Sequence, residues 1–116
     1  MVDREILCYR HLVHLGVPTE MRGYRYLKTA IMLCLQNEEY IYSVTQKLYP
    51  EIASQYATTS AAVERGIRTA IGYVCRNTSR KVLKEYFGNV QGDKLTNRKF
   101  ISGLVEYIKM EVDREQ

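Results

Sequence analysis

The chain has no tryptophan, only two prolines and only three cysteines among its 116 residues. An odd number of widely spaced cysteines is a poor disulfide framework, and Cys8, Cys34 and Cys75 all lie among apolar residues, as small core residues of a reducing compartment do. No run approaches the roughly 18 uncharged apolar residues of a membrane span. The acidic start of the chain does not have the pattern of a signal peptide. We therefore expect a cytoplasmic protein without a membrane partner.

Motifs for catalysis and cofactor binding are also missing. We find no glycine-rich phosphate loop, no Ser/His/Asp arrangement and no paired carboxylates with a reason to be perturbed. Cys8, His11 and His14 share one predicted helix, but His14 lies at an awkward angle and a fourth ligand for zinc is not evident. A core cysteine with two surface histidines is the better interpretation. We expect neither an enzyme nor a bound cofactor or metal.

Apolar residues recur at helical spacing along the chain, and no strand-like alternation competes with them. Both prolines stand where helices are expected to begin, at Pro18 and Pro50. The predicted helices cover about residues 4–15, 18–35, 39–48, 50–56 and 60–77. A sixth helix capped by Thr78 or Ser79 ends near residue 87, and after a polar loop over 89–95 a last helix is capped by Thr96. The length fits one domain around one core. The predicted fold class is all-α, with six or seven helices in a single domain over residues 1–116.

Residues 50–76 have the pattern of a helix-turn-helix, in which a scaffold helix, a tight turn and a recognition helix follow one another. We expect Ile52 and Tyr56 in the core, with small Ala53 permitting close packing of the second helix. The turn ends at Thr59, a residue type that favours the N-cap of a helix. The same order of residues is compatible with an ordinary helical hairpin, so it does not establish DNA binding.

The outer face of the predicted recognition helix favours DNA. At about 100° per residue the inward stripe is centred on Ile67 and Val74, and the opposite face combines arginines with small residues. Small residues let the backbone approach the floor of the groove, and arginine can bind guanine through two hydrogen bonds. Glu64 could accept from a cytosine amino group or, equally well, pair with Arg68 four residues on. The predicted base contacts are Ala62, Glu64, Arg65, Arg68 and Thr69.

The distribution of charge says more than the net charge of +4. Six cationic residues and no acidic one lie between Arg65 and Lys84. Cations at the end of the recognition helix and on the next helix suit the phosphate backbone, which fixes register without reading sequence. The predicted backbone contacts are Thr59, Ser60, Arg76, Arg80, Lys81 and Lys84, and a further candidate cluster consists of Lys94, Arg98 and Lys99.

Three segments resemble the C-terminal effector domain of the stage-zero sporulation response regulators of endospore-forming bacteria. They are GVPTEMRGYRYLKTAI at 16–31, SVTQKLYPEIASQYATTSAAVERGIRTAI at 43–71 and LTNRKFI at 95–101. The resemblance implies a six-helix domain that binds duplex promoter elements of TGTCGAA type, often as tandem head-to-tail copies, and that contacts RNA polymerase sigma factor. By position, Glu64, Arg65 and Arg68 match recognition-helix residues of that family.

Two outward residues depart from the family pattern: Ala62 stands where arginine is usual, and Thr69 where histidine is usual. We therefore expect sequence preference or affinity to differ. The phosphorylatable receiver domain of the family is also missing, so the chain is either an excised piece or, as Met1 favours, a stand-alone relative. The alternative function is a protein-interaction module that binds sigma factor or a full-length relative and has lost or weakened operator recognition.

Overall fold

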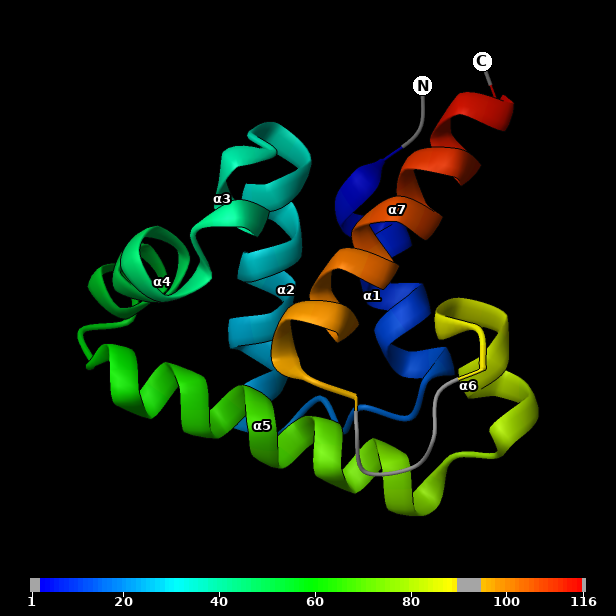
Figure 1. Ribbon diagram of the computed structural model, residues 1–116, viewed down its shortest axis with the longest axis horizontal. Helices are drawn as coiled ribbons and strands as arrows, with labels where there is room; N and C mark the ends of the chain where they lie inside the picture. Colours follow the sequence, from blue (N-terminus) through cyan, green and yellow to red (C-terminus); the bar gives the residue numbers. More distant parts are fainter. Residues whose placement is uncertain (1–2, 90–94, 116) are drawn as a thin grey trace.

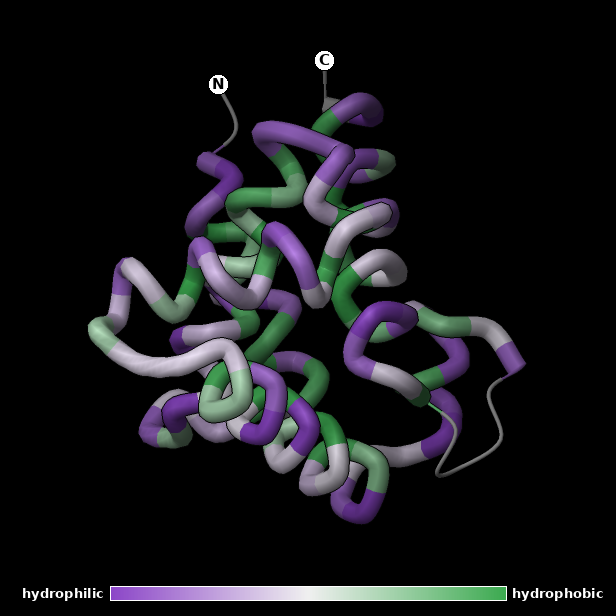
Figure 2. Tube along the Cα trace, turned by 60° about the vertical axis from the view of Figure 1, so that its left-hand side comes forward, coloured by the Kyte–Doolittle hydropathy of each residue, from purple (hydrophilic) through white to green (hydrophobic). Residues whose placement is uncertain are grey.

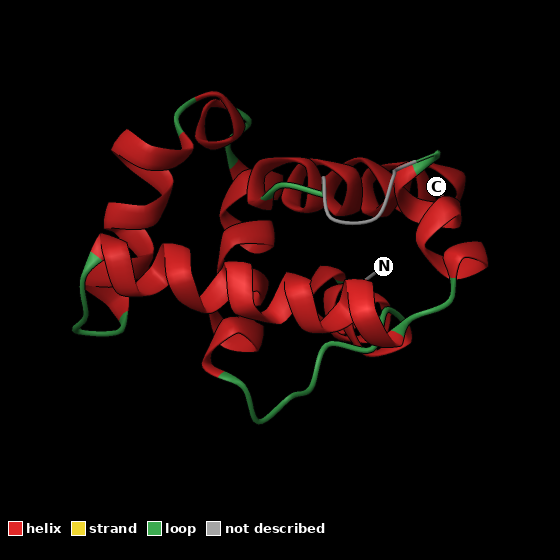
Figure 3. Cartoon of the chain, turned by 60° about the horizontal axis from the view of Figure 1, so that its bottom comes forward, coloured by secondary structure: helices red, strands yellow, loops and turns green. Residues whose placement is uncertain are grey.

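The computed structural model describes residues 3–89 and 95–115, and all regular structure within them is helical (Figures 1 and 3). The elements are α1 (Arg4–His14), α2 (Arg22–Gln36), α3 (Glu39–Tyr42), the π-helical segment η1 (Val44–Leu48), α4 (Tyr49–Gln55), α5 (Ser60–Asn77), α6 (Arg80–Phe87) and α7 (Asn97–Glu115). The predicted all-α class is confirmed. Most of the loop predicted over 89–95 lies outside the described residues. Over the described ranges, no helix is both long and apolar enough to cross a membrane.

Short polar side chains determine where several helices begin. Each accepts a hydrogen bond from a backbone N–H two or three residues further along, which satisfies a donor that has no partner inside the helix. These caps are Asp3 for α1, Thr59 for α5, Ser79 for α6 and Thr96 for α7. The last three agree with the sequence prediction.

Two predicted helices differ from the structure. α2 begins at Arg22 rather than at Pro18, because a turn intervenes in which the Met21 N–H donates to the Pro18 carbonyl oxygen at 3.2 Å. The fixed φ of proline suits a turn as well as the first position of a helix, so proline alone does not decide between them. The helix predicted over 39–48 is interrupted at Ser43, whose backbone (φ −140°, ψ 55°) is not helical, and the chain continues as η1.

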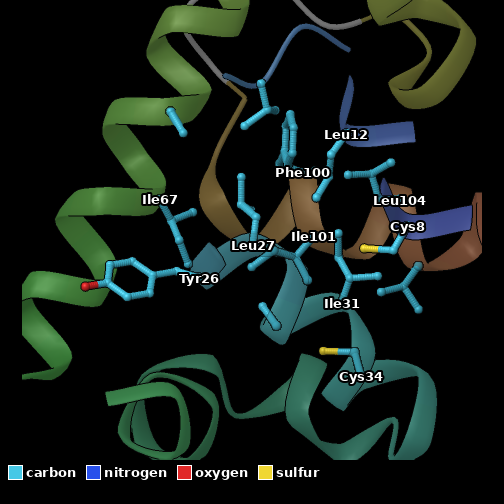
Figure 4. Packing of buried hydrophobic residues seen from close by; sticks show 14 of the residues in the cluster. Cys8, Leu12, Tyr26, Leu27, Ile31, Cys34, Ile67, Phe100, Ile101 and Leu104 are labelled. Atoms are coloured by element: carbon cyan, nitrogen blue, oxygen red, sulfur yellow. The ribbon is translucent and has the colours of Figure 1, made fainter. Parts of the chain in front are cut away.

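A single hydrophobic core joins α1, α2, α5 and α7 (Figure 4). Leu27 and Ile31 of α2 lie in its middle and are completely buried, beside Ile67 of α5 and Phe100 of α7. Burying a side chain of this size contributes roughly 1.5–3 kcal/mol. Along the chain, hydrophobic stretches alternate with hydrophilic ones, as amphipathic helices around one core require (Figure 2). The start of α1 and the end of α7 lie at the end of the molecule opposite α5 (Figure 1).

α2 and α5 cross at two glycines. A Cβ atom added to Gly23 would lie 2.3 Å from the Gly66 carbonyl oxygen and 2.8 Å from the Cβ of Ala70. A Cβ atom added to Gly66 would lie 2.9 Å from the ring of Tyr26. The two backbones approach this closely only because neither residue has a side chain. The crossing holds the first turn of α2 against α5.

The residues considered as metal ligands contribute to the core and to contacts between helices. Burial raises the pKa of the Cys8 thiol to about 12, so this side chain is a protonated core residue at neutral pH. His11, predicted at the surface, has a side chain only 12% exposed. Its Nδ1 lies 2.7 Å from the Tyr86 hydroxyl and its Nε2 lies 3.0 Å from a Glu111 carboxylate oxygen. His11 therefore ties α1 to α6 and α7.

Candidate nucleic-acid interface

α4 and α5 are joined as a helix-turn-helix by a turn over residues 57–59. The Thr58 N–H donates to the Ala53 carbonyl oxygen at 2.9 Å, and the Ala57 N–H donates to that of Ser54 at 3.5 Å, which is the Schellman arrangement. Ala57 adopts the left-handed conformation (φ 52°) that glycine usually supplies. Ile52 and Ala53 are buried, as the sequence predicts. The turn and these contacts fix the angle between α4 and α5.

Tyr56 differs from its prediction as a core residue, because it is 36% exposed. Its ring packs edge-on against Tyr26, with the centroids 5.5 Å apart, and its hydroxyl shares a 2.7 Å hydrogen bond with the hydroxyl of Thr29. A tyrosine has a polar end that prefers a partner or water, so it settles at the margin of a core more readily than in its centre. Tyr56 thus links α4 to α2 at the surface.

The outer face of α5 is open to solvent. Its inward side chains are buried, namely Val63, Ile67, Ala70, Ile71 and Val74. The exposed positions on the opposite side include Arg65, Arg68, Thr69 and Arg76, while Ala62 and Glu64 are partly buried at its margins. The helical phase predicted from the sequence therefore agrees with the structure.

Glu64 and Arg68 form the i, i+4 ion pair that was one of the two interpretations of Glu64. The Arg68 Nη1 lies 3.4 Å from a Glu64 carboxylate oxygen, and the two side chains are 64% and 37% exposed. An exposed pair of this kind contributes roughly 0.3–0.5 kcal/mol. That is little enough for either side chain to exchange its partner for a ligand.

Two grooves flank the outer face of α5, one on each side. The first, of about 310 Å³, is bordered by the start of α2 and by Ala62, Arg65 and Thr69 of α5. The second, of about 850 Å³, is bordered by η1, by the start of α7 and by Glu64 and Arg68 of α5. The five predicted base contacts therefore lie together on α5 but divide between its two flanks, with Arg65 in the middle of the face.

The predicted phosphate contacts continue along the surface from this face. Thr59 is exposed and Ser60 partly buried at the start of α5, and the exposed cations at its end and on α6 are Arg76, Arg80, Lys81 and Lys84. No ion pair within residues 3–89 and 95–115 involves these four cations. Arg98 and Lys99 are exposed at the start of α7, and Lys94 lies outside the described residues.

Sequence reasoning missed the start of α2 as part of this surface. Met21 and Arg22 border the same groove as Arg65, because the glycine crossing places them there. A glycine inside a helical pattern is a known sign of close backbone approach. That sign was present at Gly23 and Gly66, but one sequence does not tell which distant glycines meet.

Comparison with protein families agrees with this geometry. A family model described as "Sporulation initiation factor Spo0A C terminal" matches residues 8–108. The matched region contains α2 to α6 entirely and most of α1 and α7. It therefore includes the helix-turn-helix and the borders of both grooves.

Proposed function

Since this chain belongs to the family of C-terminal domains of the sporulation initiation factor Spo0A, which are DNA-binding regulators, we propose that it recognises promoter elements of TGTCGAA type in duplex DNA and regulates their transcription. The observation that carries this proposal is the exposed outer face of α5, where arginines lie among small residues. This face follows a helix start that Thr59 caps. A helix-turn-helix presents this face to the major groove. The proposed place of action is the cytoplasm, where bacterial DNA lies.

The proposed base contacts follow from the chemistry of each side chain. Arg65, central on the face, donates to the O6 and N7 atoms of a guanine, and Arg68 leaves its exposed ion pair with Glu64 to do the same. Glu64 is then available to accept from a cytosine amino group. Thr69 donates or accepts at a base edge, and the methyl group of Ala62 contacts a thymine methyl.

The proposed phosphate contacts position the helix and read no sequence. They are Thr59, Ser60, Arg76, Arg80, Lys81 and Lys84. The Thr59 hydroxyl oxygen accepts from the Ala62 N–H at 3.1 Å. A hydroxyl that accepts one bond can still donate its own proton, and a phosphate oxygen beside the turn is a suitable acceptor.

Arg65→Ala and Lys81→Ala are expected to separate base reading from phosphate binding. Arg65→Ala should cost ~1–3 kcal/mol on a TGTCGAA duplex and much less on a scrambled duplex, because only the former offers the guanine contact. Lys81→Ala should weaken both duplexes by the same factor. Fluorescence anisotropy titrations of both variants on both duplexes measure the two ratios. Equal ratios for the two variants would show that Arg65 contacts only phosphate.

Ala62→Arg is expected to strengthen recognition. The position borders the groove beside α2, one turn from Arg65, so a longer side chain can reach the base edges from there. An added bidentate pair is worth ~1–3 kcal/mol and should favour the TGTCGAA duplex over a scrambled one. Stability in a thermal melt should change by no more than ~0.5 kcal/mol, because the position is not in the core. Equal strengthening of both duplexes would mean that residue 62 meets phosphate alone.

A protein-interaction role is the second candidate function, and an exposed stripe on α1 favours it. Ile6, Tyr9 and Val13 follow one another at i, i+3 and i+7 and are 50%, 48% and 44% exposed. Apolar side chains grouped in this way often mark protein contacts. The proposed partner in this role is sigma factor or a full-length relative of this chain. A mobility-shift assay decides between the functions, since a pure interaction module would not distinguish a TGTCGAA duplex from a scrambled one.

A further inference from the structure

Two arginines outside α5 border the grooves on its opposite flanks. Arg22, the first residue of α2, borders the same groove as Arg65. Arg98, in the first turn of α7, borders the same groove as Arg68. Figure 3 shows α5 crossing the view, with the segment leading into α2 on one side and the segment leading into α7 on the other. Both arginines are exposed, and in the described parts of the chain neither forms an ion pair.

Each of these arginines is next in sequence to a residue that is fixed against α5. Arg22 is next to Gly23, whose Cα packs against the Gly66 backbone with no room for a Cβ atom. Arg98 is next to Asn97, whose side-chain amide donates to the Glu64 carbonyl oxygen at 3.2 Å and to the Tyr49 hydroxyl at 3.0 Å. The backbones that carry the two guanidinium groups are therefore held in place relative to α5 before any ligand binds.

Local helix stability does not account for these charges. The N-terminal end of a helix has a partial positive charge, so a cation in the first turn is unfavourable there and an acidic residue is favourable. The first turns of α2 and α7 contain no acidic residue. Arginine at both positions therefore indicates a negative partner outside the chain.

The dimensions of DNA identify that partner. A helix with its side chains is about 10–12 Å across, and the major groove is about 12 Å wide with phosphates of both strands along its walls. Groups on opposite flanks of a helix in this groove meet opposite strands. Resting on the proposed function, we propose that Arg22 and Arg98 form a phosphate clamp, in which each binds the backbone of a different DNA strand while α5 occupies the groove between them.

Arg22→Ala and Arg98→Ala test the clamp, with Arg4→Ala as the matched control. Arg4 is exposed and is the first residue of α1, as Arg22 is of α2. The start of α1 lies at the end of the molecule away from α5 (Figure 1). Each clamp variant should reduce the slope of log affinity against log salt by about 0.9 and lower affinity about fivefold near 0.15 M salt, since one phosphate is no longer neutralised. Arg22→Lys and Arg98→Lys should keep the slope, because they keep the charge. Arg4→Ala should match the unaltered chain.

Duplexes with single methylphosphonate groups then identify the strands. Neutralising the phosphate that Arg22 binds should weaken DNA binding by the unaltered chain but not by Arg22→Ala. The phosphate that behaves in the same way with Arg98→Ala should lie on the other strand. The clamp is wrong if both positions lie on one strand, or if both variants behave like Arg4→Ala. A chain that binds every duplex equally would overturn the proposed sequence recognition while leaving the clamp measurable on any duplex. A chain that binds no duplex would overturn both.

Discussion

Raising monovalent salt from 50 to 200 mM is expected to weaken the binding of this chain to duplex DNA about 60- to 1000-fold. The range follows from a slope of roughly −3 to −5 in a plot of log affinity against log salt, which four to five neutralised phosphates produce. Four exposed cations at the end of α5 and on α6 supply most of these phosphate contacts, namely Arg76, Arg80, Lys81 and Lys84. Because the described acidic residues form no ion pair with them, their charge is available to DNA.

The measurement is a series of anisotropy titrations on one TGTCGAA duplex and one scrambled duplex. Circular dichroism over the same salt range shows whether the chain stays folded, so that weaker binding is not mistaken for unfolding. A slope near zero on both duplexes would contradict the DNA proposal and leave the interaction module. A steep slope that is identical on both duplexes, with equal affinity, would leave DNA binding but remove sequence recognition.

Gly23→Ala is expected to be the most destabilising addition of a single methyl group at the crossing of α2 and α5. Its Cβ would lie 2.3 Å from a backbone oxygen, and backbone cannot move aside as a flexible side chain can. Overpacking typically costs 1–3 kcal/mol and occasionally more. Because α2 and α5 would be forced apart, we expect the free energy of unfolding to fall by about 3 kcal/mol or more and the Tm to fall by about 10 °C or more. Thermal or urea unfolding measures both quantities.

Gly72→Ala provides the comparison. Gly72 lies in the same helix as Gly66, but a Cβ atom there would approach only the Arg76 guanidinium, at 3.2 Å, and this end of the side chain can swing away. Replacing glycine by alanine inside a helix then stabilises by roughly 0.5–1 kcal/mol. Similar melting temperatures for Gly23→Ala and Gly72→Ala would contradict the close crossing of α2 and α5.

Features of the fold that depend on neighbouring residues could be predicted from the sequence. Thr59 and Ser79 cap helices because a short hydroxyl side chain reaches the N–H groups just beyond it, and no distant residue is needed. The structure at Pro18 does not follow from the sequence, because a proline suits a turn and a helix start equally. The break at Ser43 does not follow either, because the apolar spacing across it is helical although the backbone is not. The spacing of Tyr56 predicts a core residue, but spacing does not show how deeply a side chain is buried.

In the candidate site too, local features could be predicted and contacts between distant residues could not. The phase of α5 follows from the spacing of its apolar residues, and this spacing alone assigns Arg65 to the outer face. The neighbours of that face do not follow, because they come from distant parts of the chain. Gly23 meets Gly66, and Asn97 binds the Glu64 carbonyl oxygen, only once the core has brought α2 and α7 together. Contacts of this kind placed Arg22 and Arg98 beside α5.

The position of the chain ends has a consequence for how this domain can be combined with others. The start of α1 and the end of α7 both lie at the side of the molecule turned away from α5, as two views show (Figures 1 and 2). A fused domain, a dye or a tether at either end would therefore stay clear of DNA in the proposed complex. Joining two copies through such tethers would raise the local concentration of the second copy at a neighbouring element and increase avidity without a new contact to the bases.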